Sequence, residues 1–165
     1  MKIKRIVKHL LVTHGQVNRA FPSGALRAIE GAIQASEAQH TGEIRFVVEG
    51  GLDGMPLFKG QSARERAIEL FSRLRMWDTQ DNSGLLIYLL LADRAVEIVA
   101  DRGISAKVSP HEWSGICREM ESAFKKSSYA TGVVGGVQAL THHLVTHFPA
   151  DGRSGNELPD KPVML

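Results

Sequence analysis

The residues best suited to chemistry are four oxygen-bearing side chains around the most apolar segment of the chain. Asp78, Asp81 and Asn82 precede that segment, LLIYLLL, and Asp101 follows the next apolar run. Hard divalent cations prefer oxygen ligands, and crowded carboxylates repel one another unless they are protonated or bridged by a cation. Ca²⁺ or Mg²⁺ is therefore the candidate cofactor. The alternative is an ordinary turn at a helix end, where Asp, Asn, Ser and Gly are common.

No standard metal or catalytic motif accompanies these residues. An EF-hand loop needs a glutamate at its twelfth position, and the stretch that starts at Asp78 lacks it. His143 and His147 would share a helix face, but the residues between them lack the glutamate of HExxH and no third ligand is identifiable. Cys117 is not part of a Cys-x5-Arg motif and is interpreted as a small buried residue. The sequence therefore assigns no catalytic residue.

A mixed sheet covered by helices is expected to position these side chains. The patterns predict helices over 23–39, 62–76, 109–126 and 131–148, and strands over 42–49, 84–91 and 95–101. The first two strands are joined through a helix and should be parallel, whereas a tight turn makes the third antiparallel. LLIYLLL does not alternate, which is typical of a strand buried on both faces. We therefore predict an α/β fold, a three-layer α/β/α sandwich with a small mixed β-sheet.

The strand order indicates which side chains meet. The hairpin should bring residue 84 close to residue 101, so the four candidate ligands are expected to converge at one end of the sheet. Asp53 and the turn residue Asp93 should lie at the opposite end.

The chain is predicted to form one domain with two flanking segments. Residues 1–20 have apolar side chains at helical spacing and lysines elsewhere, which predicts an N-terminal amphipathic helix or arm. Residues 21–148 form the single α/β domain, and 149–165, rich in Pro, Gly and Asp, form a loop or disordered tail. The N-terminal segment is interpreted as an arm packed on the domain. The alternative is a surface helix that touches anionic lipid or a partner.

Composition excludes several classes of protein. A formal net charge of +2 gives no argument for nucleic acid, and no apolar run reaches the roughly 20 residues of a transmembrane segment. The basic N-terminus lacks the apolar core of a secretory signal. With a single cysteine, the chain fits a reducing compartment. We therefore expect a cytoplasmic protein without a transmembrane segment. The sequence does not identify its protein partner, and a membrane-associated partner is one alternative.

Several short motifs resemble the TPM-domain family of bacteria and plastids. They are Thr41-Gly42-Glu43-Ile44, Leu70-Phe71 with Trp77, Asn82-Ser83-Gly84-Leu85-Leu86, Asp93-Arg94, and Glu97-Ile98-Val99 with Gly103. The resemblance spans about residues 41–148. Ser83 and Asp101 depart from it, because relatives commonly have asparagine and glycine there. The resemblance implies a small α/β domain. It also implies kinship with thylakoid-lumen phosphatase-like proteins, with a photosystem II repair factor, and with domains that bind calcium near acidic loops.

Two functional hypotheses follow. The first is a TPM-like interaction or regulatory domain that binds a divalent cation such as calcium at the acidic sheet end. The second is a metal-assisted phosphatase acting on phosphomonoesters, in which Asp78, Asp81 and Asp101 hold the metal and Arg94 or Arg102 supplies positive charge. We favour the first, because no nucleophile or general base can be named.

Overall fold

A computed structural model describes residues 2–153 and 155–165. Its strands form one mixed sheet in the order β3-β2-β1-β4, in which β1 is parallel to β2 and β4, and β2 is antiparallel to β3. The strands are β1 (Glu43–Glu49), β2 (Gly84–Leu90), β3 (Ala95–Ala100) and β4 (Val163–Met164). The predicted pairing of the first three strands is confirmed.

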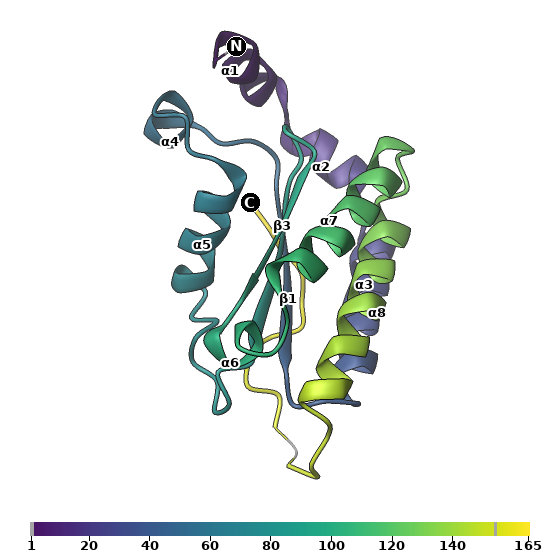
Figure 1. Cartoon of the computed structure of the whole chain (residues 1–165). Helices are drawn as coiled ribbons and strands as arrows, with labels where there is room; N and C mark the ends of the chain where they lie inside the picture. The colour runs from purple at the N-terminus through teal and green to yellow at the C-terminus, as the bar shows by residue number, and fades with distance from the viewer. Residues whose placement is uncertain (1, 154) are drawn as a thin grey trace.

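Helices cover both faces of the sheet, which confirms the three-layer α/β/α sandwich (Figure 1). The helices of one face are α3 (Ser23–Glu37), α7 (Pro110–Lys125) and α8 (Tyr129–His147). On the other face lies α5 (Ala63–Arg73), preceded by the short α4 (Gly54–Phe58). Every residue of β2 is buried, as its unbroken apolar run predicts for a central strand.

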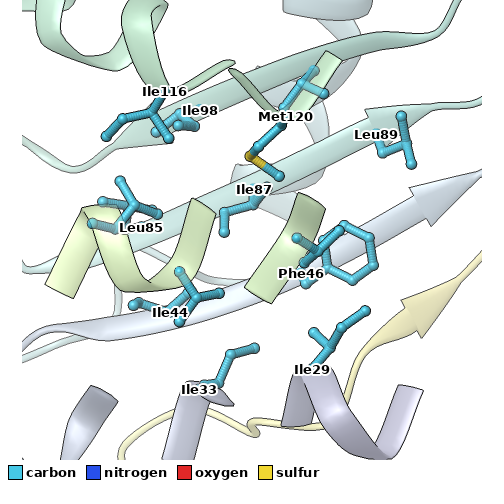
Figure 2. Close-up of a cluster of buried hydrophobic side chains, with 14 of the residues drawn as sticks. Ile29, Ile33, Ile44, Phe46, Leu85, Ile87, Leu89, Ile98, Ile116 and Met120 are labelled. Atoms are coloured by element: carbon cyan, nitrogen blue, oxygen red, sulfur yellow. The ribbon is translucent and has the colours of Figure 1, made fainter. Parts of the chain in front are cut away.

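The larger of the two cores lies between the sheet and the layer of α3, α7 and α8. Figure 2 shows Ile29 and Ile33 of α3 facing Phe46 and Ile44 of β1, respectively, and Met120 of α7 above Ile87 of β2. All of these side chains are almost wholly buried. Residues with alternate numbers along β1 and β2 face this core, and their neighbours face α5 on the other side.

The second core contains a buried ion pair. Arg66 of α5 donates from Nε and Nη2 to the two carboxylate oxygens of Glu49, at 2.9 and 2.8 Å. The hydroxyl of Tyr88, on β2, donates to Glu49 Oε2 at 2.7 Å. Three charge-assisted hydrogen bonds therefore satisfy Glu49 at the end of β1, and they fasten α5 to the sheet.

Local capping signals start two helices where they were expected. In α5, Ser62 and Glu65 form a capping box, and the N–H of Ser62 donates to the Glu65 carboxylate at 2.7 Å. In α7, Ser109 and Glu112 do the same at 2.8 Å. Such boxes satisfy backbone N–H groups that have no partner inside the helix.

The N-terminal segment forms two helices where one was expected. These are α1 (Lys2–Leu11) and α2 (His14–Ala20). The break occurs because the Thr13 side chain accepts the N–H of Gln16, while the Gln16 side chain accepts the N–H of Thr13. This reciprocal cap starts a new helix and ends the first.

Three short elements were not expected from the sequence. They are α4, in a predicted loop, α6 (Arg102–Ser105), and β4, in the predicted loop or disordered tail. The tail adds an edge strand, with Val47 beside Val163, and it buries Leu158 in the second core. Most of the described residues in 149–165 lie outside helices and strands, while Val163 and Met164 pair with Val47 and Val48 of β1.

In the described ranges, no helix is long and apolar enough to cross a membrane.

Candidate functional site

A cavity of about 570 Å³ opens at the end of the sheet where β1 and β2 begin. Its walls come from the C-terminal turn of α3, the start of β1, the loop before β2 and the tail. Five carboxyl side chains line it, and we call it the acidic cavity: Glu37, Glu43, Asp81, Glu157 and Asp160. Arg153 and His40 are also in its wall. This is the sheet end at which the sequence placed the candidate ligands.

Two of these carboxylates accept backbone N–H groups near the start of β1. The N–H of Ile44 donates to Glu37 Oε1 at 2.7 Å. The N–H groups of Glu157 and Leu158 donate to the two oxygens of Glu43, at 3.2 and 3.0 Å. Side chains thus bond backbone groups near the start of β1, because β4 pairs only with its later residues. The Glu43 carboxylate thereby holds residues 157–158 of the tail beside β1.

The two glutamates have pKa values above the ordinary range. The pKa of Glu37 rises from 4.5 to about 9. Burial is the main reason, and the nearby carboxyls of Glu43 and Asp160 contribute the rest of the rise. Burial also raises the pKa of Glu43, assisted by Glu157 and Asp160. The hydrogen bonds that these groups accept act in the opposite direction. The acidic cavity therefore holds one carboxyl group, that of Glu37, that resists ionisation near neutral pH, and a second, that of Glu43, whose pKa is also raised.

His40 is held as a neutral ring in the cavity wall. The N–H of Gly42 donates to Nδ1 at 3.1 Å, so the proton of the neutral ring lies on Nε2, which is 2.8 Å from Ser36 Oγ. Ser36 in turn lies 2.6 Å from Thr141 Oγ1, and this chain links α3 to α8. Burial lowers the pKa of His40 to about 4.

Asp78 and Asp81 are each paired with an arginine. Asp78 accepts from Arg75 Nη2 at 2.7 Å on an exposed surface, away from the acidic cavity. Asp81 lines the cavity and accepts from Arg153 Nη2 at 3.1 Å. Of the four candidate ligands, Asp81 alone is among the cavity-lining residues.

Backbone hydrogen bonds join the segment of Asn82 to that of Asp101, and they place Asp101 beside Gly84, as the hairpin geometry predicted. The N–H of Gly103 donates to the carbonyl of Asn82 at 3.0 Å, and that of Asp101 donates to Gly84 at 2.9 Å. Asn82 has a left-handed φ of 50°. Asp101 caps α6 with Oδ1, which accepts the N–H of Arg102 at 2.8 Å, while its Oδ2 is buried and has no hydrogen-bond partner among the residues that the structure describes. This oxygen is a candidate cation ligand.

The fit to a metal ion is therefore partial. Over residues 2–153 and 155–165, no three His, Cys, Asp or Glu side chains are grouped closely enough to hold a metal. The set Asp78, Asp81, Asn82 and Asp101 stays a prediction. His143 lies 3.7 Å from a Glu112 oxygen and packs its ring edge-on against Trp113, which agrees with a helix-surface role.

Sequence reasoning missed Glu37, Glu43 and Asp160. One signal was available: Glu37 lies in the last turn of a helix, where a negative charge opposes the helix dipole. A glutamate at such a position often has a compensating contact, and here that contact is the N–H of Ile44. Nothing in the pattern placed Asp160, because the path of the tail is set by tertiary contacts.

Comparisons with known proteins agree with this architecture. The model of the TPM domain family matches residues 19–143. The chain is similar to the solution structure of the BA42 protein from the psychrophilic bacterium Bizionia argentinensis, with 27% identity, a TM-score of 0.77, and coverage of 87% of this chain and 94% of that one. It shares its fold with the N-terminal domain of a P. gingivalis protein, at 19% identity and a TM-score of 0.62, covering 85% and 94% of the two chains. A search of curated proteins finds no significant match.

Proposed function

Because the chain belongs to the TPM domain family, we propose that it is a TPM-type interaction or regulatory domain that binds a divalent cation such as Ca²⁺ or Mg²⁺ at its acidic end. The observation that supports this is the crowding of carboxyl groups in the acidic cavity, where Glu43 and Asp160 raise the pKa of Glu37, and Glu157 and Asp160 raise the pKa of Glu43. A cation relieves the same repulsion that a proton relieves. Carboxylate oxygens are also the ligands that both ions prefer.

At the acidic end of the sheet, carboxylate oxygens can exchange their present partners for a cation at a small cost in free energy. Asp81 is engaged by Arg153, and Asp78 by Arg75, in exposed ion pairs. Such pairs are worth about 0–1 kcal/mol each, so a cation can displace the arginines. Within the described part of the chain, Asp101 already has a buried oxygen without a partner. When bound, the ion would supply positive charge, and these side chains would hold it.

A titration with CaCl₂ or MgCl₂, followed by amide NMR, tests the proposal. We expect shifts to cluster at residues 37–43, 80–84, 101–103 and 157–160. The apparent affinity should rise with pH, because the cation competes with the proton on Glu37. Glu37→Gln should weaken binding and flatten its pH dependence, and Asp81→Asn should weaken binding. Glu119→Gln, on the exposed face of α7, is the matched control and should change nothing.

Two outcomes separate the possible ligand sets. If Asp101→Asn abolishes the shifts and Glu37→Gln leaves them intact, the cation belongs to the residues predicted from the sequence. If neither ion moves amides at this end, the cation-binding proposal is wrong. Shifts scattered over the surface, with no effect of any variant, would show only weak nonspecific attraction.

The second candidate is a metal-assisted phosphatase acting on phosphomonoesters, which the word phosphatase in the family model's name favours. Arg102 and Arg153 lie beside Asn82 and Asp81, where positive charge would stabilise a transferring phosphoryl group. Arg94 follows β2 at the other end of the sheet. Burial raises the pKa of the Cys117 thiol to about 12, so this cysteine is no candidate nucleophile.

Hydrolysis of p-nitrophenyl phosphate with and without Mg²⁺ tests this candidate. A metal-dependent turnover that falls at least about a hundredfold in both Asp81→Ala and Asp101→Ala would support it. Turnover that both variants retain would remove these residues from the mechanism. We also propose the cytoplasmic location and the protein partner that are expected from the sequence, and each requires a separate experiment.

A further inference from the structure

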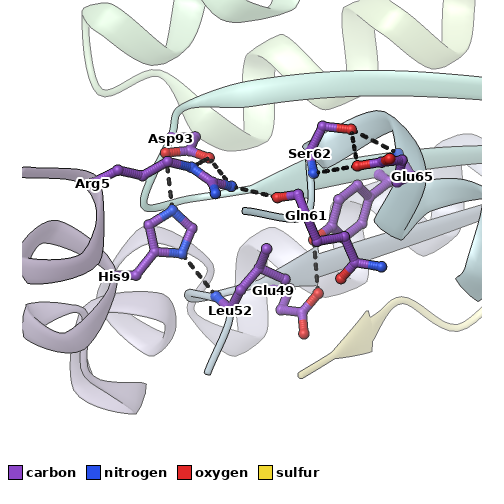
Figure 3. Close-up of polar contacts among 9 residues, drawn as sticks. Arg5, His9, Glu49, Leu52, Gln61, Ser62, Glu65 and Asp93 are labelled. Carbon is purple, nitrogen blue, oxygen red and sulfur yellow. Dashed lines mark hydrogen bonds and ion pairs between the residues drawn. The ribbon is translucent and has the colours of Figure 1, made fainter. Parts of the chain in front are cut away.

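Helix α1 is attached to the domain by its polar face. Arg5 donates to Asp93 Oδ2 from Nε at 3.0 Å, and to the carbonyl of Gln61 from Nη2 at 2.9 Å. His9 is buried, with Nε2 2.9 Å from Asp93 Oδ1, while its Nδ1 accepts the N–H of Leu52 at 2.9 Å. Figure 3 shows both side chains pointing from α1 toward Asp93. The turn between β2 and β3 thus anchors α1 through hydrogen bonds.

The apolar face of α1 points into solvent. Its members are Ile3, Val7, Leu10 and Leu11, with exposed fractions of 76%, 49%, 62% and 67%. Their spacing places all four on one side of the helix, away from Arg5 and His9. A surface helix normally turns such a stripe toward the core. Here the usual orientation is reversed, so the described residues of the domain leave about half or more of each of these side chains uncovered.

A second helix extends the same surface. Met55 and Phe58 of α4 are 62% and 60% exposed. Helices α1 and α4 contact each other and occupy the same end of the molecule, at the top of Figure 1. These two helices hold six of the eleven exposed large apolar side chains found in residues 2–153 and 155–165. We call Ile3, Val7, Leu10, Leu11, Met55 and Phe58 the apolar cap. Its concentration at one end points to a binding surface.

Basic side chains outnumber acidic ones beside the apolar cap, where Asp53 precedes α4. Lys2, Lys4 and Lys8 are exposed on α1, a helix that contains no acidic residue, and Lys59 follows Phe58. Beside α1 lies a hollow of about 450 Å³, whose lining includes Lys8, Arg19 and Arg94 and no carboxylate. Positive charge therefore borders the apolar cap on more than one side.

We propose that the apolar cap docks on the surface of a bilayer containing anionic phospholipid. Ile3, Leu10 and their neighbours would enter the boundary between headgroups and acyl chains, while the lysines meet lipid phosphates. The hollow lined by Arg19 and Arg94 can receive a headgroup. A second copy of the chain fits less well, because two helices of this charge would repel each other. Docking by this end leaves the acidic cavity, at the other end of the sheet, facing away from the membrane.

Co-sedimentation of the full chain with vesicles tests the proposal. Vesicles of equal parts phosphatidylglycerol and phosphatidylcholine should bind the protein, and vesicles of phosphatidylcholine alone should bind it far less. Added salt should weaken binding, because exposed charges are screened. Replacing Lys4 and Lys8 by Gln should reduce the partition coefficient about fivefold for each lysine, the loss expected at an anionic surface.

Matched variants distinguish binding through the apolar cap from nonspecific hydrophobic adsorption. Ile3→Ser with Leu10→Ser should abolish binding and leave the thermal unfolding transition unchanged, since both side chains are exposed. Ile68→Ser with Val145→Ser removes exposed apolar side chains from α5 and α8 and should leave binding intact. Equal binding to both vesicle types, or retention by the Ile3/Leu10 variant, would overturn the proposal. So would a dimer in sedimentation velocity that this variant dissolves, because the apolar cap would then belong to a second copy.

Discussion

Replacing Glu37 by Gln should stabilise the protein increasingly as pH rises. The amide oxygen of Gln keeps the acceptor for the N–H of Ile44, while the ionisable group disappears. In the wild type, the raised pKa means that the native state holds a proton that the unfolded chain has lost. The stability from this proton is complete below about pH 4.5 and declines as pH rises toward about 9.

The magnitude follows from linkage. One pKa unit corresponds to about 1.4 kcal/mol, so at pH 7.5, about three units above the unfolded value, the ceiling is about 4 kcal/mol. Glu37 is only half-buried in a water-accessible cavity, and solvent screens part of this energy. We therefore expect Glu37→Gln to gain about 2 kcal/mol over the wild type between pH 4.5 and 7.5. For a chain of this size, that is about 4–8 °C in Tm.

Urea denaturation of both proteins, in steps from pH 4.5 to 8.5, measures the difference. Titrating groups that do not interact with Glu37 cancel in the comparison, whereas Glu43 and Asp160, which face Glu37 from β1 and the tail, are coupled to it and contribute to the difference. Glu119→Gln, exposed on α7, should show no trend with pH. A Glu37→Gln difference that stays constant over this range, or that falls with pH, would refute the reasoning, because the carboxyl would then ionise normally.

Three further predictions concern the rest of the structure. His40 should not titrate between pH 5.5 and 8, because burial lowers its pKa to about 4, and long-range ¹H–¹⁵N spectra should show its proton on Nε2. Stability that depends on the neutral ring is present above about pH 6.5 and is lost as pH falls through 4. A normal titration midpoint for His40 would contradict this. Arg66→Met leaves the Glu49 carboxylate buried without its arginine and should cost about 3 kcal/mol in the free energy of unfolding, measured by chemical denaturation. Arg73→Met, at an exposed ion pair with Glu69, should cost under about 0.5 kcal/mol. Similar losses in the two variants would be inconsistent with a stabilising Arg66–Glu49 pair. The Cys117 thiol, whose pKa burial raises to about 12, should react with a disulfide reagent at pH 8 only after unfolding, and rapid labelling of the native protein would speak against it.

Much of the fold could be predicted because its signals are local. The run LLIYLLL has no polar side, so it required a strand covered on both faces, and β2 is buried throughout. Ser62 and Ser109 each precede a glutamate by three residues, and both start helices by the mechanism that this spacing predicts. The elements that were not foreseen, α4, α6 and β4, are too short to establish a period.

The candidate site was predicted only in part. The hairpin register brought Asp101 beside Gly84, as expected, because alternation fixes which residues pair across two strands. Whether a carboxylate is free to bind a cation depends on its partners. Arg153 reaches Asp81 from a position 72 residues later in the chain, and no spacing rule could show it.

By itself, the sequence determined the longer helices, the first three strands with their mixed pairing, and the amphipathic character of α1, since each follows from side-chain periodicity. The tertiary structure alone decided which charges became neighbours. It packed Asp160 against Glu37, and so made an acidic cavity from segments that are distant in the chain. It also decided which face of α1 meets the domain: Asp93, 84 residues after His9, holds the polar face and leaves the apolar face outward. Periodicity shows that a helix has two faces, but only the partner supplied by the fold selects the one that docks.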